Sequence, residues 1–154
     1  MLKVAIIGSG AISAAHIEAY LRFPERCEIV AVSDIYAEKA QSRIDQFKLS
    51  KAVAVEDYRH LLKLDIDLVS VCTPPYTHAP IAVDFLTAGK HVLVEKPMAS
   101  SLQECDEMNE AARRSGKILS VVAQNRFRTP MMKLKSVLDS GLAGPIVHAQ
   151  VDSY

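Results

Sequence analysis

Two glycines near the N-terminus have the type and spacing needed to hold a phosphate. The segment Gly8-Ser9-Gly10-Ala11-Ile12-Ser13 follows an apolar run and opens a stretch with helical spacing. Gly8 permits a tight turn, Gly10 lets the backbone approach a pyrophosphate, and the following helix N-terminus offers unpaired N–H groups. Ser13 occupies the third glycine place of the Gly-x-Gly-x-x-Gly pattern. It is small enough for close packing of helix and strand, though less ideal than Gly or Ala. The turn predicts a dinucleotide-binding site.

An acid stands where such a site needs one. Asp34 ends the second apolar run 21 residues after Ser13, and a ribose-binding carboxylate is expected about 20 residues on. A carboxylate there accepts hydrogen bonds from the ribose hydroxyls and repels a 2′-phosphate, which favours NAD over NADP. NADP stays possible because Lys39 and Arg43 lie on the next helix. A helix cap before Ala37 is a second role for Asp34, and the two roles are compatible.

A second pair of chemical groups ends a later apolar run, in Val94-Glu95-Lys96-Pro97. Lys96 is able to donate to a substrate oxygen and stabilise the alkoxide from which hydride leaves carbon, or to exchange a proton. Glu95 either holds the nicotinamide ribose or orients Lys96. The alternative is an ordinary surface ion pair, which contributes little stability, and spacing alone does not exclude it.

The segment Cys72-Thr73-Pro74-Pro75-Tyr76-Thr77-His78 also follows a strand-like run. Its prolines remove donors and favour a fixed loop over a cofactor, and Thr77 is positioned to cap the next helix. His78 either contacts the cofactor or packs its own loop. Cys72 either faces a ligand or is a buried small hydrophobe, which we favour. The three cysteines have no Cys-x-x-Cys spacing, so we expect reduced thiols and no metal site.

The elements that position these groups follow from recurring apolar runs. Continuous apolarity is typical of parallel strands covered on both faces, and the intervening segments have helical spacing. Strands alternating with helices predict an α/β fold with a doubly wound parallel sheet of the Rossmann type. The runs span residues 4–7, 29–32, 68–71, 92–94 and 118–122, with a shorter sixth at 52–55.

Some boundaries carry their own signals. Ser101-Leu102-Gln103-Glu104 forms a capping box for a helix that runs to Gly116. The pattern of apolar and polar residues changes near residue 123. Beyond it we expect a helix over 131–140, a turn over 141–145 and a half-buried strand over Ile146–Tyr154. We therefore predict a dinucleotide-binding domain over 1–122. Residues 123–154 are expected to begin a second α/β domain, for substrate binding and oligomerisation, that is truncated.

Composition narrows the class of partner. Lysine plus arginine equals aspartate plus glutamate at 18 each. The chain therefore has no net charge that would attract it to nucleic acid or to an anionic membrane. The longest apolar runs are four to six residues, far short of the roughly 20 that span a bilayer. Met1 leads directly into a strand with no signal peptide pattern. We expect a cytoplasmic protein with a small-molecule partner.

A family resemblance joins these segments. The stretch CTPPYTHAPIAVDFLTAGKHVLVEKPMA over residues 72–99, with the N-terminal GSGAIS and His16, resembles the Gfo/Idh/MocA oxidoreductase family. That family includes glucose–fructose oxidoreductase and inositol dehydrogenases. The resemblance covers about residues 3–128, and its Glu-Lys-Pro motif is highly specific.

The resemblance implies roles for individual residues. Lys96 is implied to be the catalytic lysine, and Glu95 and Pro97 to shape the cofactor pocket. Asn125 and Arg126, in a segment leading to the second domain, are implied to touch cofactor or substrate. The remaining implied contacts are with the dinucleotide, through Gly8, Gly10, Ala11, Ile12 and Asp34, and with its nicotinamide end, through Thr73, Pro74 and His78.

The expected activity is hydride transfer between NAD, or NADP, and a secondary alcohol of a sugar, polyol or derivative. Family members carry an Asp and His pair for proton transfer in their second domain, and we assign no residue of this chain to that role. We expect the full-length protein to form a homo-oligomer. One alternative is a non-catalytic dinucleotide- or sugar-sensing regulator on the same scaffold. Another is a cofactor-binding module that pairs through its last strand.

Overall fold

The structure, a computed structural model, describes residues 1–150 of the chain. It divides into two compact units, Met1–Val122 and the segment from Ala123 onward.

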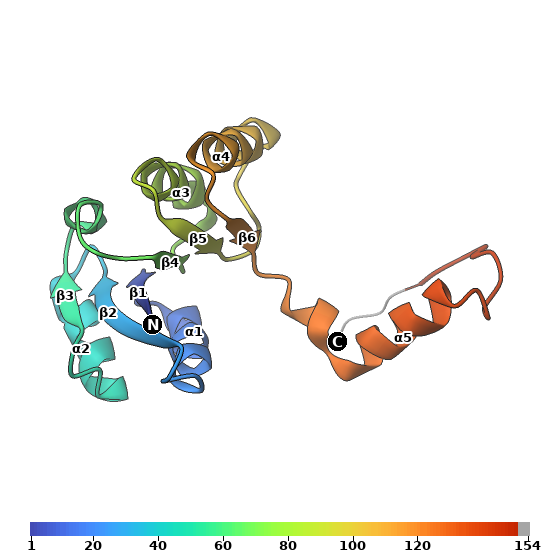
Figure 1. Cartoon of the computed structure of the whole chain (residues 1–154), viewed down its shortest axis with the longest axis horizontal. Helices are drawn as coiled ribbons and strands as arrows, with labels where there is room; N and C mark the ends of the chain where they lie inside the picture. The colour runs from blue at the N-terminus through green and yellow to red at the C-terminus, as the bar shows by residue number, and fades with distance from the viewer. Residues whose placement is uncertain (151–154) are drawn as a thin grey trace. The chain divides into compact units, whose positions relative to one another are not determined.

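The first unit is built on one parallel sheet of six strands (Figure 1). The strand order is β3-β2-β1-β4-β5-β6, so the direction of winding reverses between β1 and β4. This confirms the predicted doubly wound sheet, including the short sixth strand. The strands are β1 (Leu2–Ile7), β2 (Cys27–Ser33), β3 (Val53–Val55), β4 (Leu68–Val71), β5 (His91–Val94) and β6 (Leu119–Val121).

Helices cover both faces of this sheet. α1 (Ala11–Leu21) and α2 (Ala37–Phe47) lie on one face, and α3 (His78–Thr87) and α4 (Leu102–Ser115) lie on the other (Figure 1). Along β1, Val4 and Ile6 join the cluster under α1 and α2, whereas Ala5 and Ile7 join the cluster under α3 and α4. A strand buried on both sides has no polar face, which explains the continuous apolar runs.

The ends of α4 show why it forms there. The Ser101 hydroxyl accepts a hydrogen bond from the Glu104 amide at 3.2 Å, as the capping box predicts. The Glu104 carboxylate, however, accepts from the Ser100 amide at 2.8 Å and not from Ser101, so the box is only half formed. At the other end Gly116 adopts the left-handed conformation (φ 67°), which glycine enters without a side-chain clash.

Two short 3-10 helices follow strands at the same edge of the sheet. η1 (Tyr58–Leu61) comes after β3, and η2 (Pro75–Thr77) comes after β4 and leads directly into α3. The predicted capping of α3 by Thr77 is wrong, because no side-chain cap bond forms there. The Thr77 hydroxyl lies 2.7 Å from the Thr73 hydroxyl and 2.8 Å from the Pro74 carbonyl, so it closes its own loop instead.

The second unit contains η3 (Gln124–Phe127) and α5 (Thr129–Asp139). The predicted helix over 131–140 is confirmed, with its start moved back to Thr129 and Pro130 in its first turn. The predicted strand Ile146–Tyr154 is wrong over 146–150, which form no strand, and the remainder lies outside the described residues. The physical reason is that a strand needs a neighbour to pair with, and residues 123–150 provide none.

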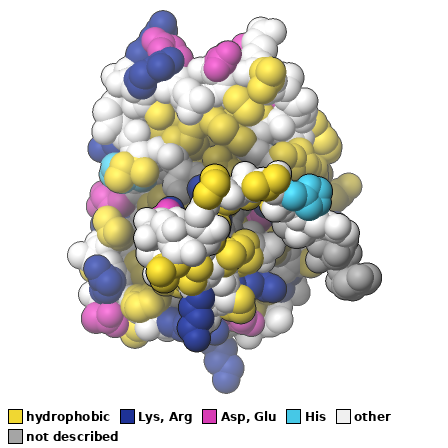
Figure 2. Space-filling view, turned by 90° about the vertical axis from the view of Figure 1, so that its right-hand side faces the viewer, with side chains coloured by type: hydrophobic (Ala, Val, Ile, Leu, Met, Phe, Trp, Pro, Cys, Tyr) yellow, Lys and Arg dark blue, Asp and Glu magenta, His cyan; other side chains and the backbone are white. Residues whose placement is uncertain are grey.

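The surface carries both signs of charge. On the face seen in Figure 2, lysine and arginine side chains lie among acidic and hydrophobic ones. Within residues 1–150 no helix has the length and apolarity needed to cross a membrane.

Candidate functional site

A cleft of about 600 Å³ opens where the sheet reverses direction. Its walls are the segments that follow the carboxyl ends of β1, β2, β3 and β4, which is where open α/β sheets bind their ligands. The lining includes seven of the predicted site residues: Gly8, Gly10, Ala11, Ile12, Asp34, Thr73 and Pro74.

The glycine turn forms one wall of the cleft. Gly8 has a φ of +92°, and a Cβ there would lie 2.9 Å from the carbonyl carbon and oxygen of Cys72 and from Cγ2 of Thr73. Only glycine fits that conformation and that contact. A Cβ on Gly10, in contrast, would meet nothing within 4 Å. The open space beside Gly10 is therefore where a ligand is able to approach the backbone.

Two side chains brace this turn from outside. The Ser13 hydroxyl donates to the Gly10 carbonyl at 2.7 Å, and Ser13 is fully buried, so a small residue suffices at this position. From α2, Arg43 Nη2 donates to the carbonyls of Ser9 and Gly10 at 2.9 and 3.0 Å. Sequence analysis placed Arg43 near the site only as a possible phosphate ligand and missed this role.

Asp34 holds the turn from the end of β2. Its Oδ2 accepts from the Ser9 amide at 2.9 Å and from the Ser9 hydroxyl at 2.6 Å, and its Oδ1 accepts from the Tyr36 amide at 3.1 Å. Burial alone would raise the pKa of Asp34, but these three hydrogen bonds outweigh it and lower the pKa below its ordinary value. The carboxylate is therefore a fixed acceptor on the cleft wall.

The segments after β3 and β4 also line the cleft. Burial raises the pKa of the Cys72 thiol to about 12, so Cys72 is an inert part of the cleft lining, as favoured from sequence. Tyr58 and Arg59 also line the cleft, and sequence analysis missed them. Burial and a hydrogen bond to Asp84 at 2.8 Å raise the pKa of Tyr58 to about 12. The position of η1 after a strand end was the available signal.

Glu95 lies buried just beyond β5 and does not line the cleft. Its Oε1 lies 3.0 Å from Nε2 of His16, and its Oε2 accepts from the Lys96 amide at 3.1 Å. Of the two roles considered for Glu95, this geometry favours orienting Lys96 over holding a ribose. No sequence signal beyond the family resemblance singled out His16.

Lys96 is exposed at the same edge of the sheet, one residue after Glu95. Within residues 1–150 its ammonium group has no hydrogen bond and no ion pair, which rules out the surface Glu95–Lys96 ion pair within the described chain. The Lys96–Pro97 peptide bond is cis. The lysine is thus free to contact a ligand.

His78 is fully buried at the start of α3 and does not line the cleft. Its Nδ1 lies 2.9 Å from the Pro97 carbonyl, and its Nε2 lies 2.8 Å from the Thr73 carbonyl. The ring therefore ties the loop after β4 to the loop after β5. The structure favours the loop-packing alternative for His78 over direct cofactor contact.

The other two predicted residues belong to the second unit. Asn125 and Arg126 lie in η3.

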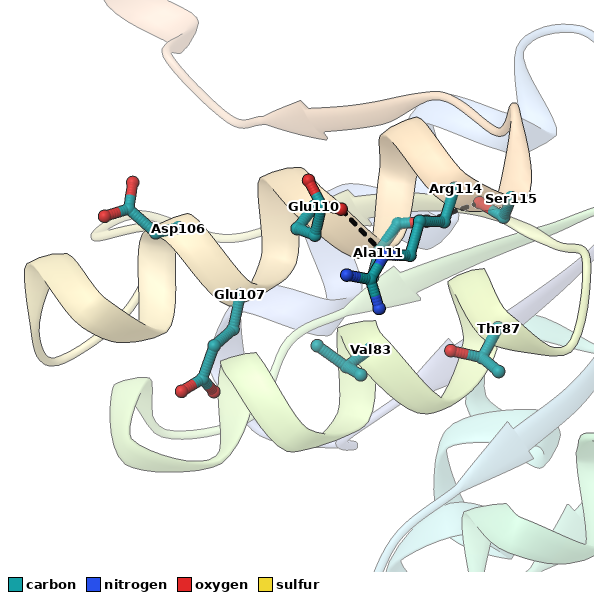
Figure 3. A pocket seen from close by; sticks show the side chains of 8 residues that line it. All are labelled: Val83, Thr87, Asp106, Glu107, Glu110, Ala111, Arg114 and Ser115. Carbon is teal, nitrogen blue, oxygen red and sulfur yellow. Dashed lines mark hydrogen bonds and ion pairs between the residues drawn. The ribbon is translucent and has the colours of Figure 1, made fainter.

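A separate hollow of about 640 Å³ lies between α3 and α4 (Figure 3). Three acidic side chains, Asp106, Glu107 and Glu110, are among its lining residues. Glu110 is paired with Arg113 and Arg114 at 2.9 and 2.7 Å. None of the predicted site residues lines this hollow. Seven of them line the cleft, whereas Lys96 does not. Among residues 1–150 no group of three or more His, Cys, Asp or Glu side chains has the arrangement of a metal site.

Comparison with known proteins accounts for this arrangement. The family model described as "Oxidoreductase family, NAD-binding Rossmann fold" matches residues 2–123. The chain belongs to the Gfo/Idh/MocA family. Membership confirms the resemblance seen in the sequence, and with it the NAD-binding Rossmann domain.

Several characterised relatives are sugar or polyol dehydrogenases. Inositol 2-dehydrogenase of Salmonella typhimurium is 32% identical over 145 residues, which cover 93% of this chain and 43% of the relative. D-glucoside 3-dehydrogenase of Escherichia coli is 32% identical over 145 residues, covering 94% of this chain and 41% of the relative. The chain thus spans about two-fifths of the length of these relatives.

Solved structures agree on the fold. The WlbA dehydrogenase of Bordetella pertussis, in complex with NADH and UDP-GlcNAcA, superposes with a TM-score of 0.87 at 28% identity. The superposition covers 93% of this chain and 43% of WlbA.

Proposed function

We propose that this chain is the cofactor-binding part of an NAD-dependent oxidoreductase that acts on a secondary alcohol of a sugar, polyol or derivative. The observation that carries the proposal is that the glycine turn and Asp34 line one cleft at the carboxyl ends of the strands. Lys96 follows the carboxyl end of β5 at the same edge of the sheet, and its ammonium group has no partner within residues 1–150. The sugar or polyol class is supported by the relatives, which include inositol and glucoside dehydrogenases.

The residues present fit a dinucleotide. At the N-terminus of α1, Gly10 makes no side-chain cap and the first turn holds no acidic residue. The amides and the positive dipole end of α1 therefore lie beside the open space at Gly10. This arrangement suits an anionic pyrophosphate. Asp34 keeps acceptor capacity beyond its three hydrogen bonds, which suits a ribose hydroxyl.

The same wall supports NAD over NADP. A 2′-phosphate would lie against the Asp34 carboxylate, whose charge repels it. The two cations of α2 nearest the site are already engaged: Arg43 donates to the glycine turn, and the Lys39 ammonium lies 4.4 Å from the centre of the Tyr36 ring. Each would have to leave its partner to bind a phosphate.

In this proposal Lys96 touches the substrate. NAD, when bound, would supply the acceptor for the hydride of the alcohol carbon, and the alcohol proton would pass to the proton-transfer pair that family members carry in their second domain. Lys96 donates a hydrogen bond to the alcohol oxygen and stabilises the negative charge that develops on it. Glu95 holds the Lys96 backbone amide, and His78 fixes the loop that carries Pro97. The prolines of the loop after β4 have no backbone N–H, so they donate no hydrogen bond to the ligand.

Further elements of the function are proposals as well. We place the domain boundary at residues 122 and 123, and we assign residues 123–154 to a substrate and oligomerisation domain. Asn125 and Arg126 are proposed contacts to cofactor or substrate from that segment. We further propose a cytoplasmic homo-oligomer that binds no nucleic acid.

The test combines binding and turnover. The 154-residue chain contains no Trp, so NADH fluorescence reports binding without a tryptophan background. Turnover of the full-length protein is measured with NAD and a panel of sugars and polyols. We expect Lys96→Met to lower kcat by about 10²- to 10⁴-fold, the range for losing a positioned acid or base. Lys63→Met, at another exposed lysine, is the matched control and should leave kcat unchanged.

The outcomes separate the alternatives. Turnover that survives Lys96→Met would remove the catalytic assignment. Tight NADH binding without turnover on any substrate would favour a sensing regulator on this scaffold. Absence of NADH binding in both the chain and the full-length protein would contradict the cofactor proposal.

A further inference from the structure

The buried face of α1 is polar, which is unusual for a helix packed on a sheet. Ser13 and His16 are buried on this face beside Ile17, and Tyr20 follows one turn later. Each polar side chain reaches a different partner: Ser13 bonds the Gly10 carbonyl, His16 bonds Glu95, and the Tyr20 hydroxyl lies 2.7 Å from the Ser70 hydroxyl. Buried polar groups of this kind are retained where their bonds fix a specific arrangement.

The contact between His16 and Glu95 is the longest of the three in sequence. The two residues are 79 positions apart, and their side chains are only 7% and 8% exposed. Because carboxylate oxygens accept, the ring donates through Nε2. The other carboxylate oxygen accepts from the Lys96 amide, so Glu95 is held at one oxygen by α1 and holds Lys96 with the other.

This chain of contacts joins the two ends of the site. α1 begins at the glycine turn, where the pyrophosphate is proposed to bind, and Lys96 follows β5, two strands away from β1 in the sheet. Without His16, the buried Glu95 carboxylate would lose a donor, and no other donor to Oε1 lies within residues 1–150. A buried carboxylate that lacks a donor moves to find one, and the Lys96 amide moves with it.

We propose that His16 is a positioning residue for the reaction: by holding Glu95, it fixes where Lys96 stands relative to the cofactor bound on α1. This inference rests on the proposed function. It assigns a role in catalysis to a helix residue that touches neither cofactor nor substrate. A displacement of about 1 Å in a catalytic group is able to cost about 100-fold in rate, so a modest loosening of Glu95 has a measurable effect.

The test uses three variants of the full-length protein. His16→Ala removes the donor, and His16→Gln supplies an amide N–H of similar reach. Tyr20→Phe removes a polar contact from the same face of α1 that leads to Ser70 and not to the lysine. We expect His16→Ala to lower kcat by about 10- to 100-fold while the KM for NAD changes by less than about threefold. His16→Gln should recover most of kcat, and Tyr20→Phe should leave it unchanged.

A purely structural role for His16 predicts a different pattern. In that case Tyr20→Phe and His16→Ala would lower kcat alike, in proportion to lost folded protein, and His16→Gln would give no specific rescue. Either that pattern or an unchanged kcat in His16→Ala overturns the inference. If His16→Ala does not fold, the kcat of His16→Gln is compared with that of the original protein. A kcat close to the original value supports the inference, because the glutamine amide supplies a donor at this position, and a large loss of kcat contradicts it.

A second readout separates this inference from the proposed function. Hydrogen exchange of the Lys96 backbone amide is measured by NMR in the 154-residue chain, where no turnover is needed. Exchange should accelerate in His16→Ala, and it should keep its original rate in His16→Gln and Tyr20→Phe. If Lys96→Met fails to affect turnover, the catalytic assignment of Lys96 fails, and the role of His16 in the reaction fails with it even where the exchange data show that His16 holds the Lys96 amide. If the Lys96 amide is unaffected by His16→Ala, the positioning role fails alone.

Discussion

At the glycine-turn end of the site, side chains from α1, α2 and the end of β2 all bond the turn itself. Ser13 bonds Gly10 three positions earlier, and Asp34 bonds Ser9 across 25 positions. At the lysine end, which lies outside the lining of the cleft, the contacts instead tie separate segments to one another. His16 reaches Glu95 across 79 positions, and His78 ties Thr73 to Pro97.

The difference shows how each end acquires its shape. A turn between a strand and a helix is set by backbone conformation, so a single glycine that is able to adopt a positive φ largely determines its shape. The lysine end has no such turn. Its shape depends on buried polar side chains that connect α1, α3 and the loops after β4 and β5, so it forms only when the whole sheet has formed.

The largest effect is expected at Gly8. Gly8→Ala forces a Cβ to within 2.9 Å of the Cys72 carbonyl at a φ of +92°. Backbone strain and overpacking together should lower the free energy of unfolding by about 3–4 kcal/mol, measured by denaturant unfolding. Gly10→Ala is the matched control, since its Cβ meets nothing within 4 Å. It should fold normally but weaken NADH binding by at least about 10-fold, because the methyl group blocks the pyrophosphate.

Equal stability of the two glycine variants would show that the turn does not depend on Gly8. Unchanged NADH affinity in Gly10→Ala would move the pyrophosphate away from this turn.

A smaller effect is expected at the lysine end. His78→Ala removes a fully buried ring and leaves the Thr73 and Pro97 carbonyls without their partner. We expect the free energy of unfolding to fall by about 2–3 kcal/mol, measured by the same denaturant titration. His60→Ala, at an exposed histidine of η1, should change it by less than about 0.5 kcal/mol. A result for His78→Ala that matches this control would mean that the tie between the loops contributes no stability.

The ease of prediction from sequence follows the same division. The glycine turn, Asp34 and the strands were predictable because each depends on local spacing: an apolar run, a turn residue, an acid at the next strand end. The stop of α4 at Gly116 is of the same kind. Even Ser13, which departs from the glycine pattern, was correctly judged small enough to pack.

The lysine end was not predictable to the same degree. Nothing near His16 in the chain indicates that it meets Glu95, because the strand order brings them together. The sequence was equally compatible with His78 as a cofactor contact and as a loop-packing residue. Its bonds to the Thr73 and Pro97 carbonyls favour the second role. Arg43 was judged by its charge, whereas its role depends on the carbonyls that α2 happens to face. The predicted strand after Pro145 failed for a related reason, since pairing requires a neighbour that local alternation does not reveal.

The smallest effect is expected from the charge of Asp34, and its sign follows from the lowered pKa. A carboxyl group whose pKa is lower in the folded than in the unfolded chain adds stability above its unfolded pKa of about 3.9. That stability is lost as the pH falls through the folded value. The unfolding free energy should therefore decline between about pH 5 and pH 2, with less than about 1 kcal/mol of the decline due to Asp34, because solvent screens a partly exposed group.

Asp34→Asn tests this assignment. The variant should show a shallower decline than the original chain when denaturant unfolding is repeated across this pH range, since the amide does not titrate. Asp106→Asn, at an exposed aspartate of α4, should leave the slope unchanged. Equal slopes in all three proteins would mean that the Ser9 and Tyr36 bonds hold Asp34 equally well whether or not it is charged. The charge of Asp34 would then add nothing to the stability of the glycine turn, and its proposed role would be confined to the ligand.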